Sequence, residues 1–168
     1  MKYPKKYRDF EIDFLGAYNL TDETDAAPYH IRNILEQFRK SATGLGDHVK
    51  ILPVMNHDDA LDEIKKKNVT ICYSLKEAMG IFVYEGMAMG HVIIRNETPG
   101  LEEQLDKNGL FASSNNFGDL VLAIEKLANI EKTSDAELLE MSSKSVEIAK
   151  EATENKYFVI EELKKILK

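Results

Sequence analysis

The segment from residue 69 to residue 90 joins a strand-like stretch, a polar turn and a helix-like stretch in direct succession. Val69–Tyr73 reads as a buried strand, the turn ends at Gly80, and an apolar run of helical character continues to Gly90. A helix that begins near Gly80 directs its free backbone N–H groups toward the turn, because the first amides of a helix have no partner within it. Such a helix start is a suitable site for an anion.

Two glutamates, Glu77 and Glu85, lie eight positions apart across this turn. Glu85 is expected about one turn into the helix, roughly 7 Å along its axis from the start. This is the approximate offset between the diphosphate of a nucleotide and the ribose beside it. A carboxylate can accept hydrogen bonds from both ribose hydroxyls. The spacing therefore suits a nucleotide diphosphate, with its phosphates at the helix start and its ribose on Glu85.

Strand-like and helix-like segments alternate along the rest of the chain. We expect strands at residues 10–18, 48–54, 69–73, 91–95 and 110–112. We expect helices at residues 28–40, 58–67, 81–89, 101–107, 117–129, 135–152 and 156–167, with Asp58 or Asp59 as the cap of the second. The alternation indicates an α/β fold, a Rossmann-like parallel sheet with helices on both faces. Ligands of such sheets bind beyond the carboxyl ends of the strands, so the loops at 73–80 and 96–100 should open on one edge.

Length and composition indicate one globular domain, residues 1–168, with a sizeable core. The sequence contains no apolar run of membrane-spanning length, and its first residues do not show the apolar pattern expected of a secretory leader. The single cysteine, Cys72, is expected as a buried small hydrophobe and suits a reducing cytosol.

The net charge of −7 argues against a nucleic-acid-binding protein, which usually needs a basic face. An anionic ligand would therefore need local amides and local cations. Basic residues gather at positions 2–8 and 164–168. These two clusters are either solvated ends or a contact with an anionic membrane surface.

An ordered set of residues extends the pattern from Ser74 to Leu110. It comprises Ser74, Glu77, Gly80, Glu85, Met87, Ala88, Gly90, Val92–Ile94, Pro99–Glu103 and Asn108–Leu110. This order resembles the paired-glutamate region of retaining GT-B glycosyltransferases of the group 1 or family 4 type. That family includes sucrose and glycogen synthases and many bacterial lipopolysaccharide and capsule enzymes.

The resemblance implies one half of a GT-B fold, the C-terminal donor-binding domain of a retaining hexosyltransferase. Such an enzyme transfers a hexose from a UDP- or GDP-sugar to a glycan or lipid-linked acceptor, without a metal and with no cofactor besides the donor. It also implies a role in cell-envelope polysaccharide biosynthesis and a cytoplasmic location, either in solution or at the inner face of the membrane.

Residue roles follow from the same resemblance. Glu77 matches the glutamate near the donor sugar and its anomeric centre and is the catalytic candidate, whereas Glu85 matches the ribose-binding glutamate. The expected donor-binding set is Glu85, Ala78, Met79, Gly80, Ile81, Glu103 and Val54. Ala78 replaces a common glycine, which puts the identity of the sugar in question. The plainer alternatives are a solvated helix residue for Glu85, a dipole-favoured helix acid for Glu77 and a capping or surface acid for Glu103.

The family pattern is incomplete at the start of the chain. GT-B enzymes have two Rossmann-like domains, and this chain matches most of the donor half, without an N-terminal acceptor domain or the first donor strand. The arginine and lysine that neutralise the diphosphate in the family have no match, since Ala17 follows Gly16. The chain is either a fragment of a longer enzyme or a short protein that needs a partner. A non-catalytic interaction module and a GT-B-like nucleotide-sugar epimerase stay open as alternatives.

Overall fold

The computed structural model describes residues 11–14, 37, 40, 49–52, 55–74, 80–98, 106–113 and 116–166. The chain divides into two compact units, Met1–Ala60 and Leu61–Lys168. The expected helix at 101–107 lies mostly outside the described residues. The expected helix at 28–40 does as well, although its described residues Gln37 and Lys40 are helical.

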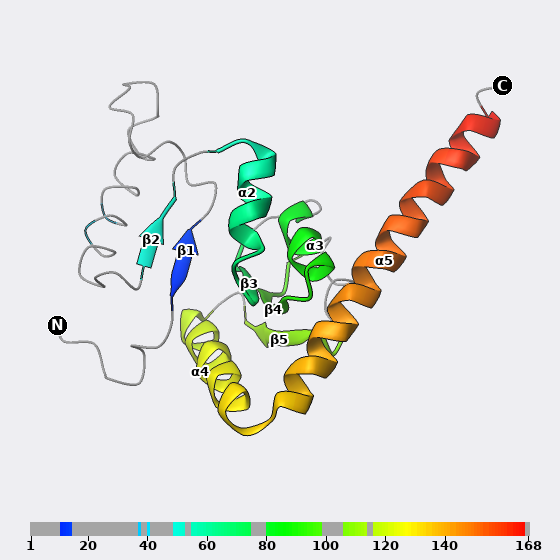
Figure 1. Ribbon diagram of the computed structural model, residues 1–168. Coiled ribbons are helices and arrows are strands. Elements are labelled where there is room, and N and C mark those ends of the chain that lie inside the picture. Colours follow the sequence, from blue (N-terminus) through cyan, green and yellow to red (C-terminus); the bar gives the residue numbers. More distant parts are fainter. Residues whose placement is uncertain are drawn as a thin grey trace. The chain divides into compact units, whose positions relative to one another are not determined.

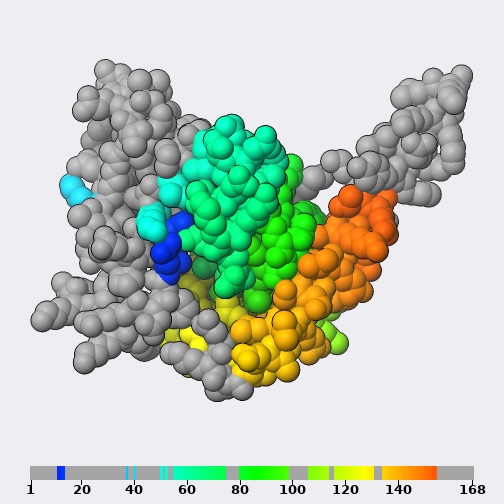
Figure 2. Space-filling model, in the orientation of Figure 1, coloured from blue at the N-terminus to red at the C-terminus, as the bar shows by residue number. Residues whose placement is uncertain are grey.

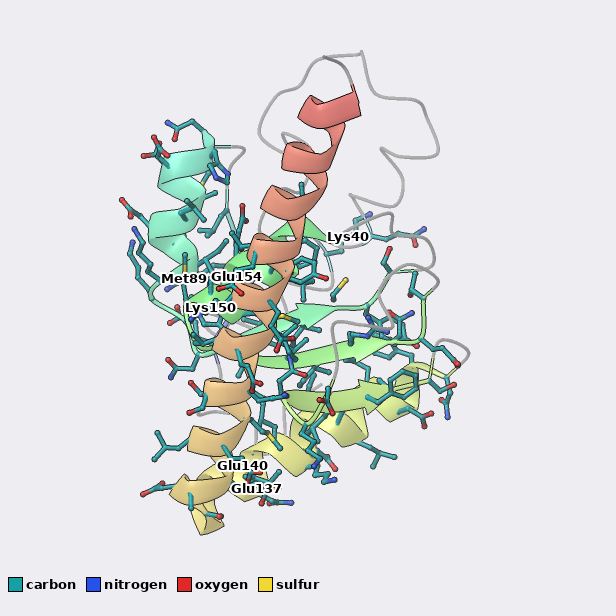
Figure 3. All side chains as sticks on the ribbon, turned by 90° about the vertical axis from the view of Figure 1, so that its right-hand side faces the viewer. Lys40, Met89, Glu137, Glu140, Lys150 and Glu154 are labelled. Carbon is teal, nitrogen blue, oxygen red and sulfur yellow. The ribbon has the colours of Figure 1, made fainter. Side chains whose placement is uncertain are left out.

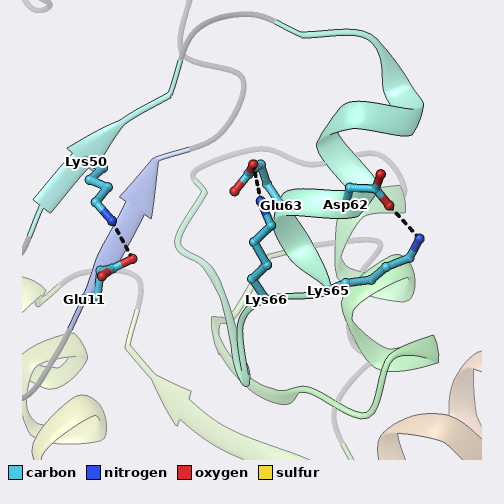
Figure 4. Close-up of polar contacts among 6 residues, drawn as sticks. All are labelled: Glu11, Lys50, Asp62, Glu63, Lys65 and Lys66. Carbon is cyan, nitrogen blue, oxygen red and sulfur yellow. Dashed lines mark hydrogen bonds and ion pairs between the residues drawn. The ribbon is translucent and has the colours of Figure 1, made fainter.

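The first unit contains a pair of short parallel strands. These are β1 (Ile12–Phe14) and β2 (Val49–Ile51), with Ile12 opposite Val49. An ion pair of 2.9 Å between Lys50 Nζ and a Glu11 carboxylate oxygen joins the two strands on their exposed side (Figure 4). Both strands lie within the ranges expected from the sequence.

Helix α2 (His57–Ile64) begins one residue earlier than expected, and its cap is Asn56 rather than Asp58 or Asp59. Asn56 Oδ1 accepts a hydrogen bond of 2.9 Å from the Asp59 backbone N–H, and Asn56 Nδ2 donates to the Asp59 carboxylate at 2.7 Å. An asparagine before the first turn satisfies an otherwise unpaired helix amide, which is why the helix can start there.

The second unit is built on a three-stranded parallel sheet in the order β3-β4-β5 (Figure 1). The strands are β3 (Val69–Cys72), β4 (Val92–Asn96) and β5 (Gly109–Ala112). Helix α3 (Ile81–Ala88) connects β3 to β4, and α4 (Phe117–Thr133) and α5 (Asp135–Ile166) follow β5. This arrangement confirms the predicted Rossmann-like architecture.

Helices cover both faces of this sheet. On one face, α4 packs on alternate residues of the strands, and the buried cluster comprises Val92, Ile94, Leu110, Ala112, Leu120, Ala123, Leu127, Ile130 and Met141. On the other face, α3 and α5 pack together over a cluster of Cys72, Val83, Met87, Ile93, Ile148 and Ala149. Figure 2 shows α3 and the first part of α5 side by side on the surface of this second layer. Cys72 is 3% exposed, as predicted for a structural cysteine.

The strand that is buried along its whole length is β4, not β3. All residues of β4 are buried, whereas Val69, Thr70 and Ile71 of β3 are half-buried. The reason is the strand order, because within the described sheet only β4 has a neighbouring strand on each side. The apolar character of Val69–Tyr73 led us to expect burial on both faces, and this expectation was wrong.

The expected helices at 135–152 and 156–167 form one continuous helix, α5 (Figure 3). Polar residues 153–155 suggested a break, but none of them is a glycine or a proline. The Thr153 hydroxyl donates to the Ala149 carbonyl one turn earlier, at 2.9 Å, so that this threonine is satisfied within the helix. None of the helices in the described part of the chain is long and apolar enough to cross a membrane.

Candidate functional site

Helix α3 starts directly after Gly80, which lies in the left-handed region with φ 52° and ψ 51°. Glycine adopts this conformation without a steric penalty, so it can turn the chain sharply into the helix. The Gly80 carbonyl accepts the first hydrogen bond of the helix, from Val83 N–H at 2.8 Å. Gly80 itself has no side chain that could cap the helix start. The first amides of such a helix point toward the preceding residues, which is the usual arrangement of an anion site at a helix start.

Glu85 is the fifth residue of α3 and is half-buried. Val83 and Met87 lie on the face of α3 that packs into the core, and both have no exposed area. Because successive helix residues are about 100° apart, Glu85 lies on a different face from these two. The Glu85 side chain is thus held on a helix with a fixed core face, about one turn from the helix start, as the sequence predicted. Ile81, at that start, is 61% exposed.

Asn96, at the carboxyl end of β4, binds the main chain at the carboxyl end of β3. Its Oδ1 accepts from Ser74 N–H at 2.9 Å, and its Nδ2 donates to the Ser74 carbonyl at 2.7 Å. The Thr98 hydroxyl donates to the same carbonyl at 2.8 Å. Asn96 and Thr98 are both fully buried. These bonds fix the first residue of the turn that leads toward Gly80.

Tyr73 makes a second connection along the same edge. Its hydroxyl donates to the Ser113 carbonyl, beyond the end of β5, at 2.7 Å. Its ring meets Phe117 edge-on with a centroid separation of 6.0 Å. The residues that follow β3, β4 and β5 are therefore joined by hydrogen bonds, and α4 begins beside them with Asn116 as its cap. These contacts lie at the carboxyl edge of the sheet, which is where ligands of parallel sheets bind.

Residues 35–150, more than half of the chain, match the family model described as "Glycosyl transferases group 1". The chain belongs to the group 1 glycosyl transferases. This membership confirms the resemblance carried by the ordered set from Ser74 to Leu110. No curated protein sequence shows a significant match to this glycosyl transferase chain.

Solved structures of glycosyltransferases share the fold of this group 1 chain. Sucrose-phosphate synthase from Thermosynechococcus elongatus superposes with a TM-score of 0.74 over 94% of this chain at 19% identity. A glycosyltransferase from Rickettsia africae gives 0.67 over 86% at 18% identity. Anabaena HepE, solved in complex with UDP and glucose, gives 0.66 over 83% at 18% identity. The chain spans 38%, 36% and 38% of these three structures, respectively.

Three of the residues expected in the donor site of this group 1 chain are described by the structure, namely Gly80, Ile81 and Glu85, and all three lie on or directly before α3. Glu77, Ala78, Met79, Glu103 and Val54 lie outside the described residues, and their roles stay predictions. Sequence reasoning did not single out Asn96 or Thr98. The signal was present, because both are polar and follow the apolar strand Val92–Ile94 at its carboxyl end.

An open groove of about 700 Å³ lies along β5 and α4. It is lined by Asp106, Lys107, Gly109, Leu110, Phe111, Ser113, Asp119, Leu122, Ala123 and Lys126. No residue of α3 contributes to it, so it is separate from the Gly80 and Glu85 region. In this glycosyl transferase the candidate site is defined by the carboxyl edge of the sheet and the start of α3, rather than by this groove.

Proposed function

We propose that this chain is the nucleotide-sugar-binding domain of a retaining glycosyltransferase. The observation that carries the proposal is the placement of Glu85 one turn into α3, whose start directly follows a left-handed Gly80. The diphosphate would lie at the α3 start, and the Glu85 carboxylate would accept from the ribose hydroxyls. Glu77 would orient the sugar near its anomeric carbon.

Two further observations support a nucleotide-diphosphate-sugar as the ligand. The chain belongs to a glycosyl transferase family, and HepE, with which it shares the fold, has been solved with UDP-glucose and with UDP and glucose. The Asn96 and Thr98 hydrogen bonds also hold Ser74 at the carboxyl edge of the sheet, where ligands of parallel sheets bind.

The complete enzyme would transfer a hexose from UDP or GDP to a glycan or a lipid-linked acceptor, with retention at the anomeric carbon. The acceptor would bind to a second domain, which is expected on the N-terminal side of this chain. Positioning of the donor and stabilisation of the leaving diphosphate would then account for most of the rate. We propose that this reaction requires neither a metal ion nor a cofactor besides the donor.

Thermal unfolding with UDP and with GDP tests the proposal on this chain. A ligand of the folded state raises stability by about 2.7 kcal/mol when its concentration is a hundredfold above its Kd. We expect a rise in Tm with one of the two nucleotides at millimolar concentration, and the loss of most of this rise in Glu85→Ala. Glu140→Ala, which removes an exposed carboxylate from α5, is the matched control and should respond as the wild type does.

The outcomes distinguish the proposal from its alternatives. A wild-type chain whose Tm responds to neither nucleotide would favour a non-catalytic interaction module. Nucleotide binding that is unchanged in Glu85→Ala would reject the ribose role of that residue. A complete enzyme that interconverts epimers of the nucleotide-sugar without transferring the sugar would identify an epimerase instead.

A further inference from the structure

Gly86, the residue after Glu85, lies where α3 touches β3. A Cβ atom added at Gly86 would overlap the Thr70 hydroxyl oxygen, and it would lie 3.1 Å from Thr70 Cβ and 3.3 Å from His91 Nδ1. Gly86 itself is buried. The backbone of α3 therefore rests directly on the side chain of Thr70, and the separation of helix and strand depends on the absence of a side chain at position 86.

His91 holds the other side of the same contact. Its Nδ1 is 2.9 Å from the Thr70 hydroxyl, and its ring is buried, with the residue only 2% exposed. Its backbone N–H donates to the Gly86 carbonyl at 3.0 Å. Its carbonyl accepts a 2.6 Å hydrogen bond from Ser145, a fully buried residue of α5. One residue thus connects β3, α3 and α5.

The position of Glu85 depends on this contact. Helix α3 has only eight residues, and Glu85 is bonded directly to Gly86. Protein interiors are close-packed, so an added methyl group at the α3–β3 contact is relieved by moving the helix or the strand. The Asn96 bonds to Ser74 secure the carboxyl end of β3, which leaves α3 as the element that moves. A displaced α3 carries the Glu85 carboxylate and the amides after Gly80 with it.

We propose that Gly86, Thr70 and His91 are positioning residues for donor binding. They set the depth at which α3 lies against β3, and so the place of the Glu85 carboxylate and of the α3 amides relative to the nucleotide. None of the three touches the ligand. The inference rests on the proposed function, because it concerns the nucleotide site formed by α3.

The test uses two kinds of variant. Some change the contact between α3 and β3, and a control variant changes only the stability of the fold. Gly86→Ala inserts the clashing methyl group, and Thr70→Ala in the same chain removes the group with which it clashes. We expect Gly86→Ala to raise the Kd for UDP or GDP at least tenfold, measured by titration calorimetry well below the Tm. The double variant should recover most of this loss. Leu127→Ala removes core side-chain volume from the opposite face of the sheet and should lower the Tm without changing the Kd.

A second pair keeps the inference falsifiable if Gly86→Ala does not fold. Thr70→Val keeps the volume and removes the hydrogen bond to His91, and we expect a Kd several-fold higher than in the wild type. Thr70→Ser retains the hydroxyl and should bind the nucleotide as the wild type does.

Three results would overturn the inference. The first is a Kd for the nucleotide that is unchanged in folded Gly86→Ala, or in Thr70→Val if Gly86→Ala does not fold. The second is a loss of nucleotide affinity in Leu127→Ala as large as the loss in Gly86→Ala or Thr70→Val. The third is a wild-type chain that binds neither UDP nor GDP. This result would overturn the proposed function as well, and it differs from the first two because it is seen in the wild type without any variant.

Discussion

The side-chain amide of Asn96 forms two hydrogen bonds with the main chain of Ser74, one accepted from its N–H at 2.9 Å and one donated to its carbonyl at 2.7 Å. An amide side chain here replaces the backbone pairing that a longer strand would provide. It continues the β3–β4 connection just past the end of β3, at the point where the polar turn begins. The chain therefore leaves β3 from a residue that two side-chain hydrogen bonds hold.

Replacing Asn96 with aspartate tests this connection. Aspartate can still accept from Ser74 N–H, but it cannot donate to the Ser74 carbonyl and brings a buried negative charge against that oxygen. We expect a loss of about 2 kcal/mol in the free energy of unfolding, measured by urea denaturation, and weaker nucleotide binding. Asn68→Asp, at an exposed position, should change stability by less than about 0.5 kcal/mol. Equal effects of the two substitutions would contradict the role of Asn96.

His91 should make stability depend on pH. Burial lowers the pKa of His91 below its ordinary value, and the nearby Ile64 backbone opposes this effect only in part. The unfolded chain therefore binds a proton that the folded chain does not, in the interval between the lowered pKa and about 6.5. Stability from this residue is full above pH 6.5 and is lost as the pH falls through the lowered pKa.

Urea denaturation at pH 7.5 and pH 5.5 checks this expectation. His91→Gln removes the titrating ring and keeps a polar side chain that can bind Thr70, so it should show a smaller decrease between the two pH values than the wild type. An identical decrease in the two proteins would show that other groups account for the acid sensitivity.

Asn116 should contribute to the stability of α4. Its Oδ1 accepts from Gly118 N–H at 3.0 Å, and its Nδ2 donates to the Asp119 carboxylate at 3.0 Å. Asn116→Ala removes both bonds and should cost about 1 kcal/mol, measured by thermal or urea unfolding. Asn116→Ser restores a capping oxygen and should recover most of that loss. If alanine and serine at this position were equally stable, the cap would have no energetic role.

Tyr73 should stabilise the sheet edge through its hydroxyl group. Tyr73→Phe removes the 2.7 Å hydrogen bond to the Ser113 carbonyl and keeps the edge-on ring contact with Phe117. We expect a decrease of about 1 kcal/mol in the free energy of unfolding. Tyr73→Ala also removes the ring and should lower the free energy of unfolding clearly more. If Tyr73→Phe were as unstable as Tyr73→Ala, the whole loss of stability would come from the hydroxyl and none from the ring contact.

The sequence predicted secondary structure correctly where a few neighbouring residues determine it. The strand Val69–Cys72, the turn at Gly80 and the helix Ile81–Ala88 were all expected from the sequence, because apolar runs and a glycine act over a few positions. The same reasoning misplaced the α2 cap, since Asn56, Asp58 and Asp59 are all good capping residues and only the backbone path selects among them. It also divided α5 at residues 153–155, where helix propensity is weaker but no residue breaks the helix.

The amino-acid sequence by itself determined the α/β class, the family and the position of Glu85 relative to the start of α3, since these depend on short-range periodicity and on the spacing of a few residues. Only the tertiary structure decided that β4 rather than β3 is the fully buried strand, that Asn96 holds Ser74, and that Gly86 lies against Thr70 and His91. The Asn96 bonds to Ser74 join residues 22 positions apart, and Gly86 lies 16 positions after Thr70. These relationships arise from strand order and from the packing of a helix on a sheet, which no local pattern records.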